Sequence, residues 1–367
     1  MSLRLLNKTF LPKELSVPRR ILMTHFGKTA ESVQSIPVLV ALRHRFPYAE
    51  IAWLIGEQLA PLVLDHWAVN RFIVVRSDWF KHLSEIRRVR QRLQAFAPQV
   101  AVDPQNSFGS SLAAWLACAK YRIGFDGKQR RSLHNLRIAS EEPHRIERNL
   151  QLLRPFGIVS CDVGFDMPEC EKDHHTARNI LHRKGLHGNF AMLYVSAENP
   201  SVQWREERFG TVAKYLLEQW NLPSLMVWAG KESEATRAET AVHAAGGAAL
   251  KAPWTTLVER KALAKLATIF IGTDTTELQI AAAVGAKCVG LFDADSAWDN
   301  APFGQEHRFI VPTDHASRQR RRRAPLSGRM DAITPELVCE QCDGVLTEIL
   351  QPGVVTIPAT PARKRAA

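Results

Sequence analysis

The chain has 367 residues, of which 46% are hydrophobic and 23% charged, an ordinary balance for a globular protein. The length favours two domains, and because no apolar run reaches ~18 residues, we expect no transmembrane helix. The net charge of +11, from 48 basic and 37 acidic residues, favours an anionic partner such as a phosphorylated metabolite, an acidic membrane face or nucleic acid.

Both ends of the chain and one basic run are expected to lie outside the folded core. Residues 1–18 are interpreted as a flexible lead-in and not a signal peptide, and residues 351–367 as a disordered tail. The run RQRRRR (318–323) is either a solvated loop or a contact to an anionic lipid surface or phosphorylated acceptor. It has no interleaved aromatic residues, so base stacking on single-stranded nucleic acid is not expected.

The cysteines do not form a recognisable disulfide framework, and their contexts favour reduced, buried thiols. Cys339 and Cys342 form a CxxC pair inside a predicted terminal helix. No second pair and no histidine lies nearby in the sequence, which argues against a zinc or redox site there.

The first half of the chain alternates strand-like apolar runs with helical patterns. We expect strands at 20–25, 50–55, 71–76, 99–103 and 121–125. The helices expected between them cover 30–46, 83–96 and 111–120, and the helix at 83–96 has a strongly basic outer face. Such alternation predicts βαβ crossovers and a parallel sheet.

A second alternating series begins near residue 190. The expected strands are 190–195, 224–230, 268–272 and 287–292, with a helix at 206–220 and another after residue 276. A closing helix covers 333–350, with Thr334 as its N-cap and Pro335 at its first position. Residues 157–185 form a linker that leads into a helix.

These patterns predict an α/β protein with two Rossmann-like, doubly wound domains. We place the N-terminal domain at 19–175 and the C-terminal domain at 176–350. The carboxyl ends of both sheets are then expected to face one central cleft, where open α/β sheets bind their ligands.

The turn GTDTT (272–276) is a candidate anion site because it precedes a helix. The first turn of a helix offers main-chain N–H groups and a partial positive charge, which suit a phosphate. An equally open interpretation is a simple N-cap. The turn is not a GxGxxG fingerprint, which argues against a nicotinamide-dependent Rossmann enzyme.

Several segments, taken in order and spacing, resemble the heptosyltransferase family of glycosyltransferases (glycosyltransferase family nine), which has the GT-B architecture. The resemblance covers roughly residues 19–350. It is carried by RILMTHFGKTAESVQSIP (20–37), VAVDPQNSFGSSLAAW (100–115), HRIERNLQLL (144–153), SVQWREERFG (201–210) and GTDTTELQIAAAVGAKCVGLFD (272–293).

The resemblance implies transfer of a heptose from ADP-heptose to the inner core of lipopolysaccharide, with inversion at the anomeric carbon and without an obligatory metal or other cofactor. Glu31 occupies the position of the base that deprotonates the acceptor hydroxyl. The implied donor-binding residues are Ser196, Glu232, Asp274, Thr275, Thr276 and Gln279. The implied acceptor-binding residues are His25, Lys28 and Arg122, with Arg145 and Arg148 at further basic positions; His25 is equally a candidate core residue.

The sequence departs from the family pattern at several of these positions. Glu31 replaces an aspartate, and its extra methylene shifts the carboxylate by about an ångström, which can lower the rate ~100-fold. In the turn and the helix after it, Thr276 replaces a glycine and Gln279 replaces a histidine. Val202 replaces a lysine expected near the diphosphate, and Gly109 lies near the place of another expected lysine. Arg205 and Lys231 are candidate substitutes for the lost charge.

We therefore expect an inverting glycosyltransferase that takes a nucleotide-sugar donor, ADP-heptose or a related molecule, and an anionic glycolipid acceptor. It is expected to be cytoplasmic, with a peripheral contact to the inner membrane, and not to bind nucleic acid. The alternative is a catalytically degenerate family member that binds a nucleotide sugar or glycan without turnover. A nucleic-acid binder would instead show steep salt dependence and little effect of mutating Asp274.

Overall fold

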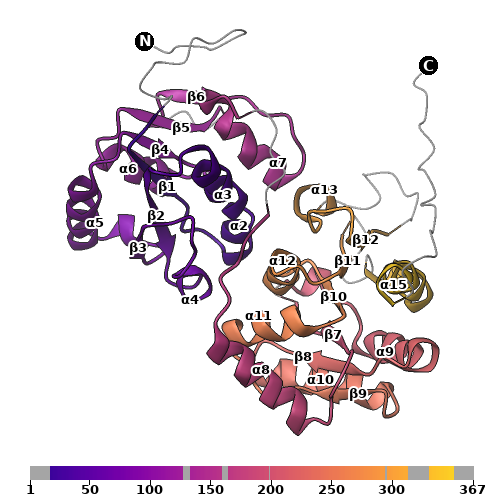
Figure 1. The fold of residues 1–367 in the computed structure, drawn as a ribbon. Helices are drawn as coiled ribbons and strands as arrows, with labels where there is room; N and C mark the ends of the chain where they lie inside the picture. Colours follow the sequence, from indigo (N-terminus) through magenta and orange to yellow (C-terminus); the bar gives the residue numbers. More distant parts are fainter. Residues whose placement is uncertain are drawn as a thin grey trace, which may run out of the picture.

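The computed structural model describes residues 17–126, 133–158, 164–197, 199–293, 296–312 and 330–350. Within them the chain forms two α/β domains, the N-terminal one above the C-terminal one in Figure 1. Most of the predicted lead-in (1–18), the tail 351–367 and the arginine run 318–323 lie outside the described residues.

The N-terminal sheet is parallel, with the described strands in the order β3-β2-β1-β4-β5-β6. These strands are β1 (Arg20–Thr24), β2 (Glu50–Gly56), β3 (Arg71–Val75), β4 (Val100–Val102), β5 (Tyr121–Phe125) and β6 (Leu136–Ile138). The chain leaves β1 to one side and returns to β4 on the other, so a topological switch point lies between β1 and β4.

The C-terminal sheet repeats this order as β9-β8-β7-β10-β11-β12, again with all described pairs parallel. Its strands are β7 (Ala191–Tyr194), β8 (Ser224–Val227), β9 (Ala249–Lys251), β10 (Ile269–Thr273), β11 (Cys288–Leu291) and β12 (Arg308–Ile310). The switch point lies between β7 and β10. Two Rossmann-like, doubly wound domains were predicted, and this prediction is confirmed.

Helices cover both faces of each sheet. The N-terminal domain contains α2 (Thr29–Val33), α3 (Ile36–Arg45), α4 (Ala60–Val63), α5 (Leu83–Phe96), α6 (Phe108–Leu116) and α7 (Arg145–Leu150). The C-terminal domain contains α8 (Glu171–Arg183), α9 (Glu206–Trp220), α10 (Glu232–Ala244), α11 (Leu257–Leu266), α12 (Thr276–Ala283), α13 (Ala297–Asn300) and α15 (Pro335–Leu350). Of the helices in the described ranges, none is both long and apolar enough to cross a bilayer.

Short 3₁₀ helices complete the connections: η1 (Trp79–Lys81), η2 (Gln151–Phe156), η3 (Pro200–Val202) and η5 (Met330–Ala332). The single helix expected at 30–46 is in fact two, α2 and α3, with a break at Gln34 and Ser35. Pro37 lies in the first turn of α3, where its missing N–H is tolerated, so the helix restarts there instead of continuing.

One hydrophobic cluster runs through both domains. It includes residues of the N-terminal sheet such as Met23 and residues of the C-terminal sheet such as Phe270. Helices α2, α3, α11 and α12 contribute the residues between them. Separate clusters lie on the outer faces, under α5 and α6 in one domain and under α9, α10 and α15 in the other. Contacts between α2 and α12 therefore belong to a continuous core. Figure 1 shows these two helices at the boundary between the domains.

The segment between the domains is held from both sides. His66, after α4, has Nε2 2.9 Å from the carbonyl oxygen of Phe165, and Lys261 on α11 donates to the carbonyl of Pro168 at 2.8 Å. The predicted domain boundary at 175/176 falls inside α8, which packs against α11.

The buried cysteines fill the core as protonated thiols. Cys339 and Cys342 on α15 are buried, and all the described cysteines are free. Burial, together with the carboxylate of Asp343, raises the pKa of Cys339 to about 12. Both thiols are therefore in the protonated form near neutral pH, the less reactive state of a cysteine.

Arg43 gives a test of how α3 is attached to the sheet. Its guanidinium is buried and donates to the carbonyl oxygens of Ala49 at 2.7 Å, Pro47 at 2.9 Å and Ala68 at 3.2 Å. We expect Arg43→Met to lower the free energy of unfolding by about 2–4 kcal/mol, because these acceptors lose their donors. Arg45→Met, two residues on at an exposed position, should change it by less than about 1 kcal/mol. Urea unfolding checks both; equal effects would contradict this account.

Candidate active site

A cavity of about 400 Å³ lies between the domains at the carboxyl ends of β1, β7 and β10. The N-terminal domain contributes Lys28, Ala30, Glu31, Gln34 and Arg145. The C-terminal domain contributes Asn199, Val202, Asp274, Thr275, Thr276, Gln279, Asp293, Ser296 and Asn300. The cavity therefore adjoins the switch points of both sheets, where such folds bind ligands.

Glu31 lies on α2, the helix that directly follows β1. Its side chain is 31% exposed, and one carboxylate oxygen is 3.8 Å from Nη1 of Arg145. It lines the same cavity as Asp274, although the two residues are 243 positions apart in the chain. A carboxylate in this position is accessible to a ligand and is oriented by a neighbouring cation.

Arg145 also joins the two domains. Its Nη2 lies 2.5 Å from Oδ2 of Asp299 on α13, and Nη2 of Arg148 lies 2.6 Å from the other oxygen of the same carboxylate. Asp299 thus accepts hydrogen bonds from two arginines of α7. The Nε of Arg145 is buried and has no hydrogen-bond partner among the residues that the structure describes.

The turn at 272–276 forms the opposite wall of the cavity. Thr275 is the N-cap of α12: its hydroxyl accepts a hydrogen bond from the N–H of Leu278 at 3.4 Å. The predicted capping role is therefore present. The amino end of α12, with its partial positive charge, adjoins the cavity. Thr276 does not adopt a positive φ, so a threonine fits here without backbone strain.

Asp274 is the acidic residue of this turn. Burial raises the pKa of its carboxyl group, while hydrogen bonds with Ser296 and Asn300 act in the opposite direction. Nδ2 of Asn300 lies 3.3 Å from Oδ2 of Asp274. The carboxyl group is therefore oriented by neighbours and still borders the cavity.

Gln279 is buried one turn into α12 and contacts both domains. Its side-chain oxygen accepts a hydrogen bond from Nε2 of Gln34 at 3.1 Å, and its own Nε2 donates to the carbonyl of Asn300 at 2.6 Å. Asn149 on α7 in turn donates to the main-chain oxygen of Gln34 at 3.3 Å. Gln279 thus fixes the distance between α2 and α12.

Ser196 and Glu232, two further predicted donor-binding residues, lie beside the cavity and do not line it. The buried hydroxyl of Ser196 follows β7 and accepts a hydrogen bond from the N–H of Ala229 after β8, at 3.4 Å. Glu232 is exposed at the start of α10. Both therefore lie at the carboxyl edge of the C-terminal sheet, toward β8.

The structure does not bring two of the predicted acceptor-binding side chains to the cavity lining. His25 is buried beneath α2, with Nδ1 2.8 Å from the hydroxyl of Ser32. The guanidinium of Arg122 on β5 donates to the main-chain oxygens of Leu133 and Ala119, each at 2.8 Å. Lys28, the third, lines the cavity directly before α2.

Sequence reasoning did not single out several lining residues. Gln34, Asn199, Ser296 and Asn300 carry no motif, and only their positions after strands of a parallel sheet would have suggested them. Asp293 is the clearest of this kind, since it follows β11 closely.

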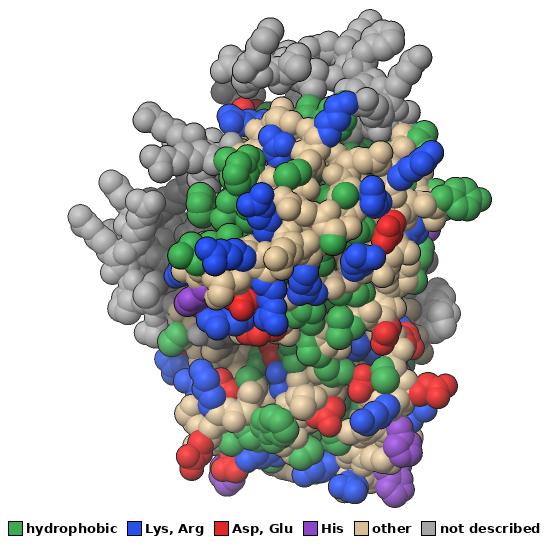
Figure 2. Space-filling model, turned by 90° about the vertical axis from the view of Figure 1, so that its left-hand side faces the viewer, with side chains coloured by type: hydrophobic (Ala, Val, Ile, Leu, Met, Phe, Trp, Pro, Cys, Tyr) green, Lys and Arg blue, Asp and Glu red, His purple; other side chains and the backbone are tan. Residues whose placement is uncertain are grey.

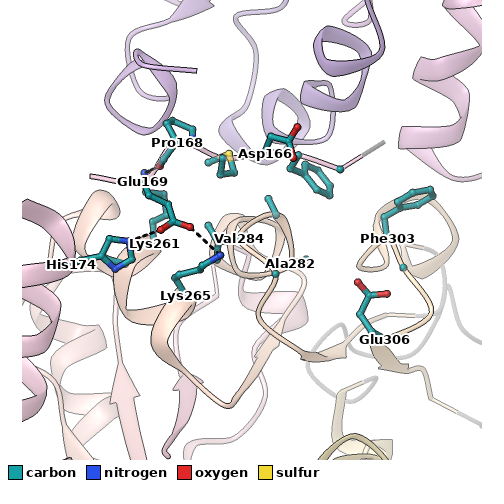
Figure 3. A pocket seen from close by; sticks show the side chains of 17 residues that line it. Asp166, Pro168, Glu169, His174, Lys261, Lys265, Ala282, Val284, Phe303 and Glu306 are labelled. Carbon is teal, nitrogen blue, oxygen red and sulfur yellow. Dashed lines mark hydrogen bonds and ion pairs between the residues drawn. The ribbon is translucent and has the colours of Figure 1, made fainter. Parts of the chain in front are cut away.

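A second cavity, of about 490 Å³, lies at the other end of α12, between the inter-domain segment and α11 (Figure 3). Three of its titratable groups interact with one another: Glu169 lies 3.1 Å from Lys265 and 3.4 Å from His174. It adjoins the carboxyl end of α12, whose partial charge is negative. The first cavity is therefore the better candidate for an anionic ligand.

Comparison with known proteins identifies the family. The family model of glycosyltransferase family 9 (heptosyltransferase) matches residues 86–328, well over half of the chain. The chain belongs to glycosyltransferase family 9. The resemblance found in the sequence is thereby confirmed, and so is membership of a family of glycosyltransferases.

Two curated relatives show how distant the relationship is. Lipopolysaccharide heptosyltransferase 3 of Escherichia coli K12 is 22% identical over 270 residues, which cover 70% of this chain and 78% of that protein. Lipopolysaccharide heptosyltransferase 1 of Salmonella typhimurium is 21% identical over 206 residues, covering 51% of this chain and 63% of that protein. The matched part thus spans less than two thirds of the Salmonella protein.

Solved structures of family 9 share the whole two-domain arrangement. A glycosyltransferase family 9 structure from Veillonella parvula has a TM-score of 0.77 at 17% identity, covering 90% of this chain and 98% of that one. An ADP-heptose lipopolysaccharide heptosyltransferase II from E. coli has a TM-score of 0.71 at 20% identity, covering 90% and 99%. These likenesses confirm the predicted GT-B architecture.

His25 predicts a pH dependence of stability. Burial, and secondarily the charge of Arg145, lowers its pKa to about 3 in the folded protein, whereas the unfolded chain protonates near pH 6.5. Between these values the unfolded state binds more protons, so this residue contributes stability that is lost as the pH falls below about 6.5.

We expect His25 to account for a loss on the order of 2 kcal/mol between pH 7 and pH 5. The variant His25→Gln should lack that component, while His44→Gln, at an exposed position on α3, should keep it. Urea unfolding at the two pH values measures the difference. An unchanged pH dependence in His25→Gln would show that the histidine is not held neutral.

Proposed function

We propose that the protein is an inverting glycosyltransferase that transfers a sugar, heptose, from a nucleotide-sugar donor to an anionic glycolipid such as the inner core of lipopolysaccharide. The observation that carries this is the single cavity lined by Glu31 on one side and by Asp274 and the amino end of α12 on the other. Two of its relatives are lipopolysaccharide heptosyltransferases, and structures of a related E. coli heptosyltransferase contain ADP or ADP-2-deoxy-2-fluoro heptose.

The donor diphosphate would bind at the amino end of α12, next to Thr275 and Thr276. Main-chain N–H groups and the helix dipole suit a phosphate there. Asp274 would accept hydrogen bonds from the donor's sugar hydroxyls. The nucleoside would extend along the carboxyl edge of the C-terminal sheet toward Ser196 and Glu232, with Glu232 on the ribose.

Glu31 would act as the general base. Its carboxylate takes the proton of the acceptor hydroxyl while that oxygen bonds to the anomeric carbon, and the bond from this carbon to the diphosphate oxygen breaks. Attack from the side opposite the diphosphate inverts the anomeric centre. The positions of Glu31 and α12 on opposite walls of the cavity support this in-line arrangement.

Arg145 is a candidate for the charge lost at Val202. Val202 lines the cavity without a charge, and Arg145 brings a cation to the same cavity; its buried Nε has no hydrogen-bond partner in the described part of the chain. A positive charge near the departing diphosphate stabilises the developing charge. Lys28 would contribute a second cation, on the acceptor side.

The acceptor chemistry suggests where the protein acts. A glycolipid presents its sugars at a membrane surface, so the protein would be cytoplasmic, with a peripheral contact to the inner membrane. The net charge of +11 suits such an anionic surface.

The alternative is a family member that binds a nucleotide sugar or glycan without turnover. The observation that favours it is the cavity's charge balance: Lys28 and Arg145 face three carboxyl groups, Glu31, Asp274 and Asp293. In addition, Asp299 already pairs with Arg145. Binding and turnover therefore need separate tests.

Asp274→Ala tests the donor site. We expect the dissociation constant for ADP-heptose to rise about 10- to 100-fold, because a hydrogen bond to a charged group contributes about 1.5–3 kcal/mol. Asp65→Ala, which removes an exposed carboxylate of the N-terminal domain, should leave it within about twofold. Isothermal titration calorimetry measures both. Equal affinities for Asp274→Ala and the wild type would place the donor elsewhere.

Glu31→Gln tests the base. It keeps the size of the side chain and removes its basicity, so kcat should fall about 100- to 10,000-fold while the donor's dissociation constant stays within about threefold. The matched control is Glu57→Gln, an exposed carboxylate that follows β2. Transfer to a lipopolysaccharide core acceptor is followed by release of ADP. Donor binding without transfer in the wild type would instead support the alternative.

A further inference from the structure

The basic helix α5 and the neighbouring helix α6 form a surface that the proposed site does not use. We define the α5–α6 surface by Leu83, Arg87 and Arg90 on α5 and by Phe108, Leu112 and Trp115 on α6. In both helices these residues have the spacing i, i+4 and i+7, so within each helix they share one face. The other face of each helix packs on the sheet through Val89, Leu93, Ala113 and Ala114.

Large apolar side chains on this surface are exposed to solvent. Leu83 is 76% exposed, Phe108 55% and Trp115 52%. The ring centroid of Phe108 lies 6.2 Å from that of the half-buried Phe80, three residues before Leu83, so apolar groups at the amino ends of the two helices lie close together. Contiguous apolar exposure of this kind marks an interaction site more often than isolated residues do.

Gly109 allows this arrangement. A Cβ atom at this position would lie 2.6 Å from the ring of Phe80, so that ring would have to move, and 3.0 Å from the ring of Phe26, a tight contact. The family resemblance implies a lysine near this position. Here Gly109 stands instead, and because it has no side chain, Phe80 can lie against α6. This packing supports Phe108 from beneath.

The same surface is strongly basic. Helix α5 carries Arg87, Arg88, Arg90 and Arg92 against one acidic residue, Glu85, which pairs with Arg88 at 3.6 Å. Arg87 and Arg90 form no ion pair with any residue in the described ranges. Figure 2 shows this side of the molecule, with many Lys and Arg side chains and apolar side chains among them in its upper half. Cations beside exposed aromatic and aliphatic groups complement the headgroups and upper acyl region of an anionic bilayer.

The surface also borders the edge where the candidate active site lies. Helix α6 begins after the carboxyl end of β4, and η1 begins after the carboxyl end of β3. Helix α2, which carries Glu31, begins at the same edge of the sheet, after β1. The ring of Phe80 lies 6.4 Å from that of Phe26, which stands between β1 and α2. A bilayer held against the α5–α6 surface would thus lie close to the acceptor side of the cavity.

We propose that the α5–α6 surface docks on an anionic lipid bilayer, with Leu83, Phe108 and Trp115 entering the interface and Arg87 and Arg90 contacting anionic headgroups. The inference deepens the proposed function and rests on it for the expectation that the acceptor is a membrane glycolipid. It concerns a different surface, so it is tested without donor or acceptor.

The test is co-sedimentation of the full-length protein with phosphatidylcholine vesicles that contain or lack phosphatidylglycerol. We expect binding only with phosphatidylglycerol, weakened by salt. The pair Arg87→Glu and Arg90→Glu should lower the partition coefficient on the order of 10-fold or more, and the pair Leu83→Ser and Phe108→Ser should lower it severalfold.

Two matched controls separate this surface from general attraction. Arg178→Glu with Arg183→Glu reverses two exposed charges on α8, and Tyr48→Ser removes an aromatic side chain that is 99% exposed at the opposite edge of the N-terminal sheet. Both should leave the partition coefficient within about twofold. If the wild type does not sediment, or if the control reversals weaken binding as much as those on α5, the proposal is overturned.

Calorimetry with ADP-heptose on the same variants keeps the two proposals distinct. Unchanged donor affinity in the α5 and α6 variants shows that they are folded and that their loss is specific to lipid. Failure of the wild type to bind any nucleotide sugar would overturn the proposed donor site and leave the vesicle result standing. Equal binding to soluble RNA and to vesicles, lost together in the α5 pair, would mean a general polyanion surface and would also overturn bilayer docking.

Discussion

The contact between α2 and α12 determines the geometry of the candidate site. The buried hydrogen bond between Gln34 and Gln279 holds the first helix after β1 against the helix after β10, and so places Glu31 and Asp274 on facing walls of one cavity. Because both sheets have the same strand order, each presents its switch point to this boundary. Without the contact, the same residues would belong to two separate half-sites.

Apolar packing and polar contacts have different roles at this boundary. The continuous hydrophobic cluster through α2, α3, α11 and α12 supplies most of the attraction between the domains, since buried apolar area stabilises in proportion to its size. The pairs of Arg145 and Arg148 with Asp299 are partly exposed, and such pairs typically stabilise by about 0–1 kcal/mol each. Their larger effect is to fix the orientation of α7 over α13, which keeps the guanidinium of Arg145 beside Glu31.

The local pattern of the sequence was enough to predict every described strand except β6, β9 and β12, and also the bounds of α5 and α9, because these elements bury regular apolar faces. Three-residue edge strands such as β6 and β12 have too few residues for a pattern. The turn at Asp274 was recognisable from its position before a helix, and Glu31 from the family resemblance. Arg145 was likewise named from the family resemblance, whereas Gln34 and Asn300 owe their place in the cavity to contacts between the domains, which no local pattern records.

A structure of the protein with a nucleotide sugar bound tests the central claim most directly, because it locates the diphosphate and the anomeric carbon together. The account predicts the diphosphate at the amino end of α12, and the anomeric carbon turned toward Glu31 with room between them for one acceptor hydroxyl. A diphosphate bound elsewhere, or an anomeric carbon that faces away from Glu31, would contradict it.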